Sequence, residues 1–240
     1  MLLAVDIGNT RSKAAVFKDS RSLERLVFPK NELRQNLLAI LAATPEITDI
    51  ILSSVGHESI DFPLPSGVKV HAISHQSRFP FENLYETPHT LGIDRMVLAA
   101  GATLRFPGVN RLVIDAGTCI TYDFVDAHDR YHGGAISPGI RLRYEALHNY
   151  TAKLPLLQAE MPQGFIGHST AGSIHAGVVC GVLNEIDGFI EQYSKSAENF
   201  IIILTGGDAD FLANRLKNTI FANPNFLLES MERIFIQNTK

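Results

Sequence analysis

The sequence lacks several features that would point to particular classes of protein. It has no tryptophan and only two cysteines, Cys119 and Cys180, and neither belongs to a CxxC motif. No apolar run approaches the roughly 18 residues that a membrane-spanning helix requires. No basic segment opens the chain, and Asp6 comes too early for the apolar part of a signal peptide. These absences predict a cytoplasmic protein with no membrane contact, whose two thiols are reduced and buried.

The sequence also lacks an excess of basic residues. Lys and Arg number 21 and Asp and Glu number 25, which gives a formal net charge of −4. Nucleic-acid-binding domains usually carry a basic excess, so we expect no nucleic acid as a partner. Hydrophobic residues make up 45% of the 240 residues, which is enough for one large or two small globular domains with real cores.

The pattern of apolar residues predicts strands that alternate with helices. Leu33, Leu37 and Leu41 recur at helical spacing before Pro45, whereas DIILSSV is a short apolar run typical of a strand buried on both faces. The predicted strands of the first half span 2–7, 13–17, 23–28, 49–55 and 68–74, and the predicted helices span 31–44, stopped by Pro45, and 94–106. This order is typical of the α/β class.

Two similar polar turns occur at strand ends in the two halves of the chain. In MLLAVDIGNTRSK the apolar run ends at Asp6, and RLVIDAGTCIT repeats the pattern at Asp115. Glycine in such turns lets backbone N–H groups approach phosphate oxygens. The hydroxyls of Thr10 and Thr118 are hydrogen-bond donors, the carboxylates suit a cation, and Lys13 is placed to neutralise a phosphate. Each turn alone also fits an ordinary hairpin.

The repeated turn predicts an internal duplication, with domains at residues 1–109 and 110–240. The second half continues with a helix at 141–154, a long helix at 170–193, the strand and turn NFIIILTGG, and a helix at 208–216. Glycines within the long helix predict close approach of another backbone, as in a dimer interface or tight helix packing.

The three turns DIGNTRSK, DAGTCIT and LTGGD, in this order, resemble the actin-like ATPase superfamily, which includes sugar kinases. The segment YETPHTLGIDR resembles the Y-x-x-P-x-x-L-G-x-D-R signature of type III pantothenate kinases, and further motifs of that family follow in order over essentially the whole chain. The resemblance implies two duplicated ribonuclease-H-like α/β domains, each with a mixed sheet flanked by helices, and an ATP cleft between them. It also implies phosphorylation of pantothenate to 4′-phosphopantothenate by ATP, the first step of coenzyme A synthesis.

The resemblance implies roles for single residues as well. Asp94 is then the catalytic base at the primary hydroxyl of pantothenate, Asp115 holds a potassium or ammonium ion, and Asp6 lies on the Mg²⁺ side. The family is dimeric, so we expect a homodimer in which Thr170 reaches the substrate of the neighbouring subunit. The implied pantothenate-binding residues are Tyr85, Gly92, Ile93, Asp94, Arg95 and Thr170. The implied ATP-binding residues are Asp6, Ile7, Gly8, Asn9, Thr10, Arg11, Ser12, Lys13 and Thr118.

Other interpretations of these residues stay open. Asp94 is also consistent with a residue of the first helical turn that only stabilises its helix. Tyr85 is consistent with a packing residue, and either Ser169 or Thr170 with the N-cap of the long helix. The chain also fits another small-molecule kinase of the superfamily, or a non-catalytic regulatory relative, since some relatives were first described as accessory factors for transcription. A ribonuclease-H-like nuclease is disfavoured by the net negative charge and by the D-x-G-N-T turn, which suits the phosphates of a nucleotide.

Overall fold

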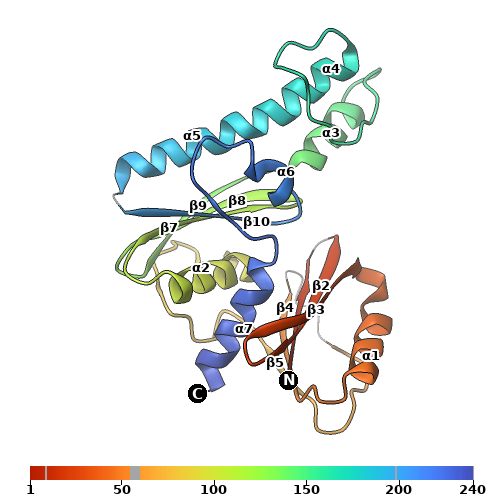
Figure 1. Ribbon diagram of the computed structural model, residues 1–240, viewed down its shortest axis with the longest axis vertical. Coiled ribbons are helices and arrows are strands. Elements are labelled where there is room, and N and C mark those ends of the chain that lie inside the picture. The colour runs from red at the N-terminus through yellow and green to blue at the C-terminus, as the bar shows by residue number, and fades with distance from the viewer. Residues whose placement is uncertain (9, 55–59, 198, 240) are drawn as a thin grey trace. The chain divides into compact units, whose positions relative to one another are not determined.

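The structure, a computed structural model, describes residues 1–8, 10–54, 60–197 and 199–239. The chain divides into two compact units. Unit 1 contains Met1–Pro107 together with Asn225–Lys240, and unit 2 contains Gly108–Pro224. Each unit has its own mixed sheet and its own helices (Figure 1).

Unit 1 contains a five-stranded sheet with the order β3-β2-β1-β4-β5. Neighbouring strands among β1, β2 and β3 are antiparallel, whereas β4 runs parallel to β1 and β5 runs parallel to β4. All six residues of β1 are buried, which explains its nearly unbroken apolar run. The strands of this unit are β1 (Leu2–Ile7), β2 (Arg11–Lys18), β3 (Arg21–Pro29), β4 (Asp49–Ser54), β5 (Lys69–Ala72) and the short β6 (Glu82–Asn83).

Helix α1 and the pair α2 and α7 are the main helices of unit 1. Leu37 and Ile40 of α1 join a buried cluster with Leu3 and Val5 of β1. Helices α2 and α7 pack closely, because a Cβ on Gly101 of α2 would meet the side chain of Ser230 on α7. The helices are η1 (Lys30–Glu32), α1 (Leu33–Ala43), η2 (Pro88–Thr90), α2 (Ile93–Arg105) and α7 (Phe226–Thr239).

Unit 2 repeats the strand pattern of unit 1. Its own strands follow the order β9-β8-β7-β10-β11, with β7, β8 and β9 antiparallel and with β10 and β11 parallel to β7. The same order and directions occur in unit 1, so the predicted duplication is visible in the topology. The strands are β7 (Asn110–Ala116), β8 (Cys119–Val125), β9 (Arg130–Pro138), β10 (Phe200–Thr205) and β11 (Phe221–Ala222).

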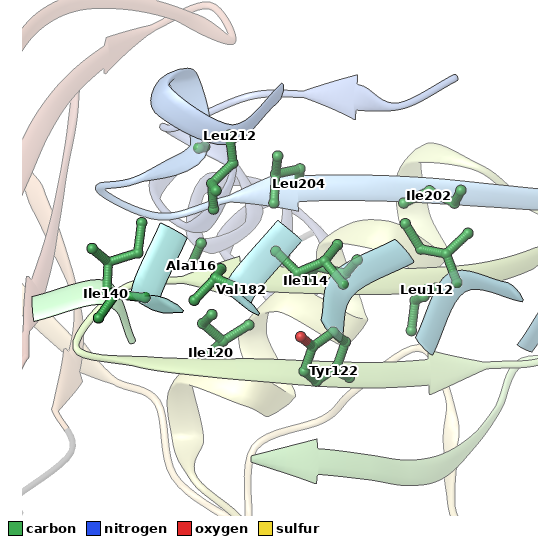
Figure 2. Packing of buried hydrophobic residues seen from close by; sticks show 14 of the residues in the cluster. Leu112, Ile114, Ala116, Ile120, Tyr122, Ile140, Val182, Ile202, Leu204 and Leu212 are labelled. Carbon is green, nitrogen blue, oxygen red and sulfur yellow. The ribbon is translucent and has the colours of Figure 1, made fainter. Parts of the chain in front are cut away.

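The core of unit 2 lies between this sheet and helix α5. Figure 2 shows Ala116 and Ile114 of β7 and Ile120 of β8 near Val182 of α5, and all four side chains are buried. The remaining elements are α3 (Ile140–Asn149), α4 (Thr170–His175), the π-helical turn η3 (Ala176–Cys180), α5 (Gly181–Ser196) and α6 (Ala209–Ala213).

The α/β class and the two mixed sheets agree with the sequence prediction, but several details differ. The helix expected at 141–154 ends at Asn149. Helix α7, which the sequence prediction missed, belongs to unit 1 although we expected residues 110–240 to form one domain. Helix α7 belongs to unit 1 because its buried residues Leu227, Met231 and Ile234 pack there and because α7 closely contacts α2.

The expectation of two buried thiols is not met by either cysteine, and it is clearly wrong for Cys119. Both cysteines are free, but Cys119 is exposed and Cys180 is half-buried. Cys119 is the first residue of β8 and directly follows the polar turn, where the chain still lies at the surface. In the described part of the chain, no helix is long and apolar enough to cross a membrane.

Candidate functional site

The first polar turn joins β1 to β2 in unit 1. Gly8 donates its N–H to the carbonyl oxygen of Arg11 at 3.1 Å, and a Cβ on Gly8 would lie 2.9 Å from that oxygen. A larger residue at this position would push the turn apart. Thr10 is exposed, whereas Asn9 lies outside the described residues. The turn is therefore tight, with a hydroxyl at its surface.

Asp6 and Lys13 lie opposite each other in the β1–β2 register, so their side chains share one face of the sheet. Asp6 is 5% exposed, Lys13 is half-buried, and Lys13 forms no ion pair with any residue that the structure describes. Ile7 and Ser12 are fully buried, so only their backbone groups can meet a ligand at the surface. The turn thus presents backbone groups, one carboxylate and one amine.

The sequence interpretation missed Ser53, which lies level with Asp6 on the other neighbouring strand, β4. The Ser53 hydroxyl is fully buried and makes no hydrogen bond to the described residues. The available signal was the pair of serines that ends the apolar run DIILSS. A polar side chain from each of two adjacent strands therefore lies at the same end of the sheet.

The N-terminal turn of α2 holds the second group of candidate residues. Asp94 Oδ1 accepts a hydrogen bond from the backbone N–H of Arg95 at 2.9 Å. A Cβ on Gly92 would lie only 2.4 Å from the same oxygen, so the carboxylate occupies the space that a side chain at Gly92 would fill. Ile93 is 6% exposed and anchors the turn in the core. The absence of a side chain at Gly92 thus leaves room for the Asp94 carboxylate, and the Arg95 N–H holds it in this orientation.

Arg95 and Tyr85 meet beside this turn. The Arg95 guanidinium carbon lies 5.7 Å from the centre of the Tyr85 ring, in the range of a cation–π contact. Arg95 is 5% exposed. The structure therefore brings Tyr85, Gly92, Asp94 and Arg95 into one cluster. His75, which sequence interpretation missed, supports the cluster by a 2.8 Å hydrogen bond between its Nε2 and the carbonyl oxygen of Leu91.

The second polar turn follows β7 in unit 2. Asp115 is the penultimate residue of β7, as Asp6 is of β1, and it pairs with Thr205 of β10. The glycine turn after β10 lies against it, since a Cβ on Gly206 would be 2.4 Å from Asp115 Oδ1 and 2.4 Å from the carbonyl oxygen of Ala116. Gly206 has a φ of 98°, a conformation that glycine adopts without strain.

Backbone carbonyl groups surround the same turn. Gly139 donates its N–H to the carbonyl oxygen of Thr118 at 3.0 Å, and a Cβ on Gly139 would lie 2.2 Å from the carbonyl oxygen of Gly117. The Asp115 carboxylate and these carbonyl groups are oxygen donors, the type that hard cations prefer. Among the described residues, no group of three or more His, Cys, Asp or Glu could hold a metal ion. Thr118 itself is exposed.

A partly buried network that the sequence did not predict connects elements of unit 2. Glu185 of α5 accepts hydrogen bonds from Tyr122, Ser137 and Arg143, which lie on β8, β9 and α3. Burial disfavours the charged form of Glu185, but these hydrogen bonds outweigh burial and lower its pKa. Burial raises the pKa of Asp208, which follows the glycine turn. The network therefore connects four elements through one ionised carboxylate.

Thr170 is the first residue of α4, and it is exposed. The N-cap is Ser169, whose Oγ accepts a hydrogen bond from the N–H of Gly172 at 3.0 Å. Of the two N-cap candidates, Ser169 therefore has this structural role, and the Thr170 side chain is left for other contacts. The candidate residues 6–13 and 85–95 belong to unit 1, whereas Asp115, Thr118 and Thr170 belong to unit 2.

Known proteins share this fold. The structure of a protein from Campylobacter jejuni assigned to the Baf family of transcriptional activators has a TM-score of 0.64 at 22% identity, covering 99% of this chain and 98% of that chain. A protein from Listeria monocytogenes assigned as an N-acetylmannosamine kinase has a TM-score of 0.57 at 14% identity, covering 100% of this chain and 99% of that chain. These likenesses show that the chain shares its fold with these two proteins.

Sequence comparison identifies the family. The model of the type III pantothenate kinase family matches residues 2–192. The type III pantothenate kinase of Flavobacterium johnsoniae is 61% identical over 237 residues, which cover 98% of this chain and 97% of that protein. This chain belongs to the type III pantothenate kinase family.

Proposed function

We propose that this protein transfers the terminal phosphoryl group of ATP to the primary hydroxyl of pantothenate, giving 4′-phosphopantothenate for coenzyme A synthesis. Membership of the type III pantothenate kinase family supports the reaction. The observation that carries the proposal is the α2 N-terminus, where the Asp94 carboxylate lies against Gly92 and beside Arg95. We place the reaction in the cytoplasm, because ATP and the later steps of coenzyme A synthesis are found there.

In this proposal Asp94 positions the substrate hydroxyl and accepts its proton. Phosphoryl transfer has a loose transition state in most analyses, so positioning and charge neutralisation supply most of the rate. A positioned base adds about 10²–10⁴-fold. Pantothenate is an anion, and Arg95 together with the free N–H groups of the α2 N-terminus attracts its carboxylate. Gly92 and Ile93 line the substrate, and Tyr85 covers it while holding Arg95 by their ring contact.

The polar turns bind the phosphates of ATP in the same proposal. Gly8 lets the phosphates approach the turn closely, Asn9, Thr10 and Arg11 contribute backbone N–H groups and side chains, and Thr118 contributes its hydroxyl from the second turn. Ile7 and Ser12 act through their backbones, because their side chains are buried. Lys13 neutralises phosphate charge. Its amine is available for this role because it forms no ion pair with the described residues.

Two cations complete the chemistry. Mg²⁺ is usually bound by one or two carboxylates together with substrate phosphates, and the single carboxylate of Asp6 fits that pattern. Bound Mg²⁺ would neutralise phosphate charge. Asp115 and the neighbouring carbonyl groups would hold K⁺ or NH₄⁺, because these ions accept neutral oxygen donors around one carboxylate.

The protein is proposed to act as a homodimer, with Thr170 of one subunit reaching the pantothenate of the other. Large apolar side chains in the segment around α4 are exposed: Tyr150 is 89% exposed, Phe165 86% and Ile166 71%. Phe165 and Ile166 are neighbours in the sequence, and exposed apolar side chains that lie together are typical of an interaction surface. A Cβ on Gly177 or Gly181 would meet nothing within 4 Å, so this side of the helix is open to a second backbone.

An ADP-release assay with ATP, Mg²⁺, K⁺ and pantothenate tests the reaction. We expect ADP release that depends on pantothenate, and a loss of about 10²–10⁴-fold in kcat for Asp94→Asn with an unchanged thermal melting curve. Absence of pantothenate-dependent turnover would contradict the proposed substrate. Turnover with other small alcohols but not with pantothenate would indicate a different kinase of the superfamily. If neither pantothenate nor any other alcohol gave turnover, the protein would be a regulatory relative.

A further inference from the structure

A cavity of about 570 Å³ lies entirely within unit 1, on residues that no step of the proposed reaction uses. Ligand sites for small molecules usually have volumes of about 300–1,000 Å³. Its walls come from the β2–β3 hairpin, from the C-terminal end of α2 and from one face of α7. Its lining residues are Phe17, Ser20, Arg21, Ser22, Arg25, Leu104, Arg105, Glu229, Glu232, Arg233, Ile236 and Gln237.

Four arginines and only two glutamates line this cavity, so its ionisable side chains carry a positive balance. Arg25 and Arg105 both approach the Glu229 carboxylate, each at 3.4 Å. Their side chains are still 44% and 31% exposed, so both guanidinium groups remain accessible. The side chains of Arg21 and Arg233 form no hydrogen bond or ion pair with the residues that the structure describes. Positive charge therefore faces the cavity without matching negative charge.

The cavity wall also contains polar groups that lack partners within the described chain. Glu232 is 7% exposed as a whole residue, and its carboxylate has no ion pair or hydrogen bond there, although its oxygens are not among the fully buried atoms without partners. The Gln237 Oε1 atom is buried and has no hydrogen bond to the described residues. Leaving a buried acceptor unsatisfied is costly, so a group with hydroxyl or amine donors would stabilise this wall. Phe17, Leu104 and Ile236 supply apolar contact beside it.

We propose that this cavity binds a small polyanion, such as a metabolite that carries several phosphate or carboxylate groups and hydroxyl donors. The guanidinium group offers paired N–H donors that match the oxygens of a phosphate or a carboxylate, and four such groups suit more than one negative charge. The hydroxyl donors of the same molecule would meet Glu232 and Gln237. The volume admits a small molecule rather than a folded protein. The proposal goes beyond the proposed kinase reaction and does not depend on it.

Isothermal titration of the full chain with inorganic pyrophosphate, and separately with citrate, tests the site. The two arms distinguish a phosphate from a carboxylate source. The key variant is Arg21→Gln combined with Arg233→Gln, because neither side chain has a partner among the described residues whose loss would unfold the protein. Removing one charged hydrogen-bond donor lowers affinity by about tenfold or more, so we expect at least about 100-fold weaker binding for the double variant.

Two controls separate this site from the phosphate turns. Arg141→Gln removes one positive charge from a 71% exposed side chain on α3 of unit 2, and we expect its affinity to equal that of the wild type. Lys13→Gln tests binding at the β1–β2 turn, and we expect the cavity binding to persist in it. Arginine-dependent binding of either anion supports the proposal. Binding of neither anion, or binding that falls in Lys13→Gln but not in the double arginine variant, overturns it.

Discussion

Replacing Gly92 by alanine is a sharp test of how the α2 N-terminus works. The new Cβ would lie 2.4 Å from Asp94 Oδ1, where contacts under about 3 Å essentially never occur, so the carboxylate has to move. A displacement of about 1 Å from a productive geometry costs on the order of 10²-fold in rate. We therefore expect kcat to fall by about 10–100-fold, whereas the KM for ATP stays unchanged.

The same substitution should leave the fold almost unaffected. Gly92 has φ −58° and ψ 136°, an extended conformation that alanine adopts freely. Alanine is a poorer N-cap than glycine by about 0.5–1 kcal/mol, but it also restricts the unfolded chain by about 0.4–1 kcal/mol. We expect a net change below about 1 kcal/mol in the free energy of unfolding. A loss of activity at nearly constant stability would then report the position of the carboxylate.

Steady-state kinetics and urea denaturation of Gly92→Ala check both halves of this expectation. Gly188→Ala is the matched control, because a Cβ there meets nothing within 4 Å, and it should keep the wild-type kcat. The double variant of Gly92→Ala with Asp94→Asn should be no slower than Asp94→Asn alone, since both changes disable the same carboxylate. A kcat of Gly92→Ala close to that of the wild type would refute this reasoning.

The remaining predictions concern the cation, acid stability and assembly. Replacing K⁺ and NH₄⁺ by Na⁺ should suppress turnover, and Asp115→Asn should remove the dependence on K⁺; equal rates in Na⁺ and K⁺ would remove the cation from Asp115. Burial disfavours the ionised form of Asp126, but hydrogen bonds from His132, Arg130 and the backbone outweigh it and hold its pKa well below the usual range. The resulting stability is present above the unfolded pKa of about 3.9 and is lost as the pH falls below it. Asp126→Asn should lower the free energy of unfolding by about 2 kcal/mol at neutral pH and should flatten its decline in acid, measured by denaturant unfolding; an unchanged acid profile would contradict this. Phe165→Asp should convert a dimer into a monomer in light scattering and should reduce turnover. A wild-type protein that is itself monomeric would contradict the proposed homodimer.

Much of the fold follows from local patterns in the sequence. β1 spans Leu2–Ile7 as predicted, because its apolar run is bounded by a polar turn and is buried throughout. The start of α2 lies within one residue of the prediction, since Gly92 precedes a continuous helical pattern. The prediction fails for α7, where the apolar spacing of Leu227, Met231 and Ile234 is visible in the sequence but its packing partner is not. Its contacts with α2 and with strands β1, β2 and β4 assign that helix to unit 1.

The sequence by itself determined the duplicated α/β pattern, the polar turns at Asp6 and Asp115, and the signature around Asp94, because these depend on the order and spacing of residue types. The tertiary structure decided which side chains meet. Burial leaves only backbone groups of Ile7 and Ser12 for a ligand. The Asp94 carboxylate lies in the space that a Cβ on Gly92 would fill, and the Arg95 N–H holds it there. It also placed arginines from the β2–β3 hairpin, α2 and α7 around one cavity, although they are far apart in the chain. Such contacts depend on packing between distant segments, which spacing along one chain does not encode.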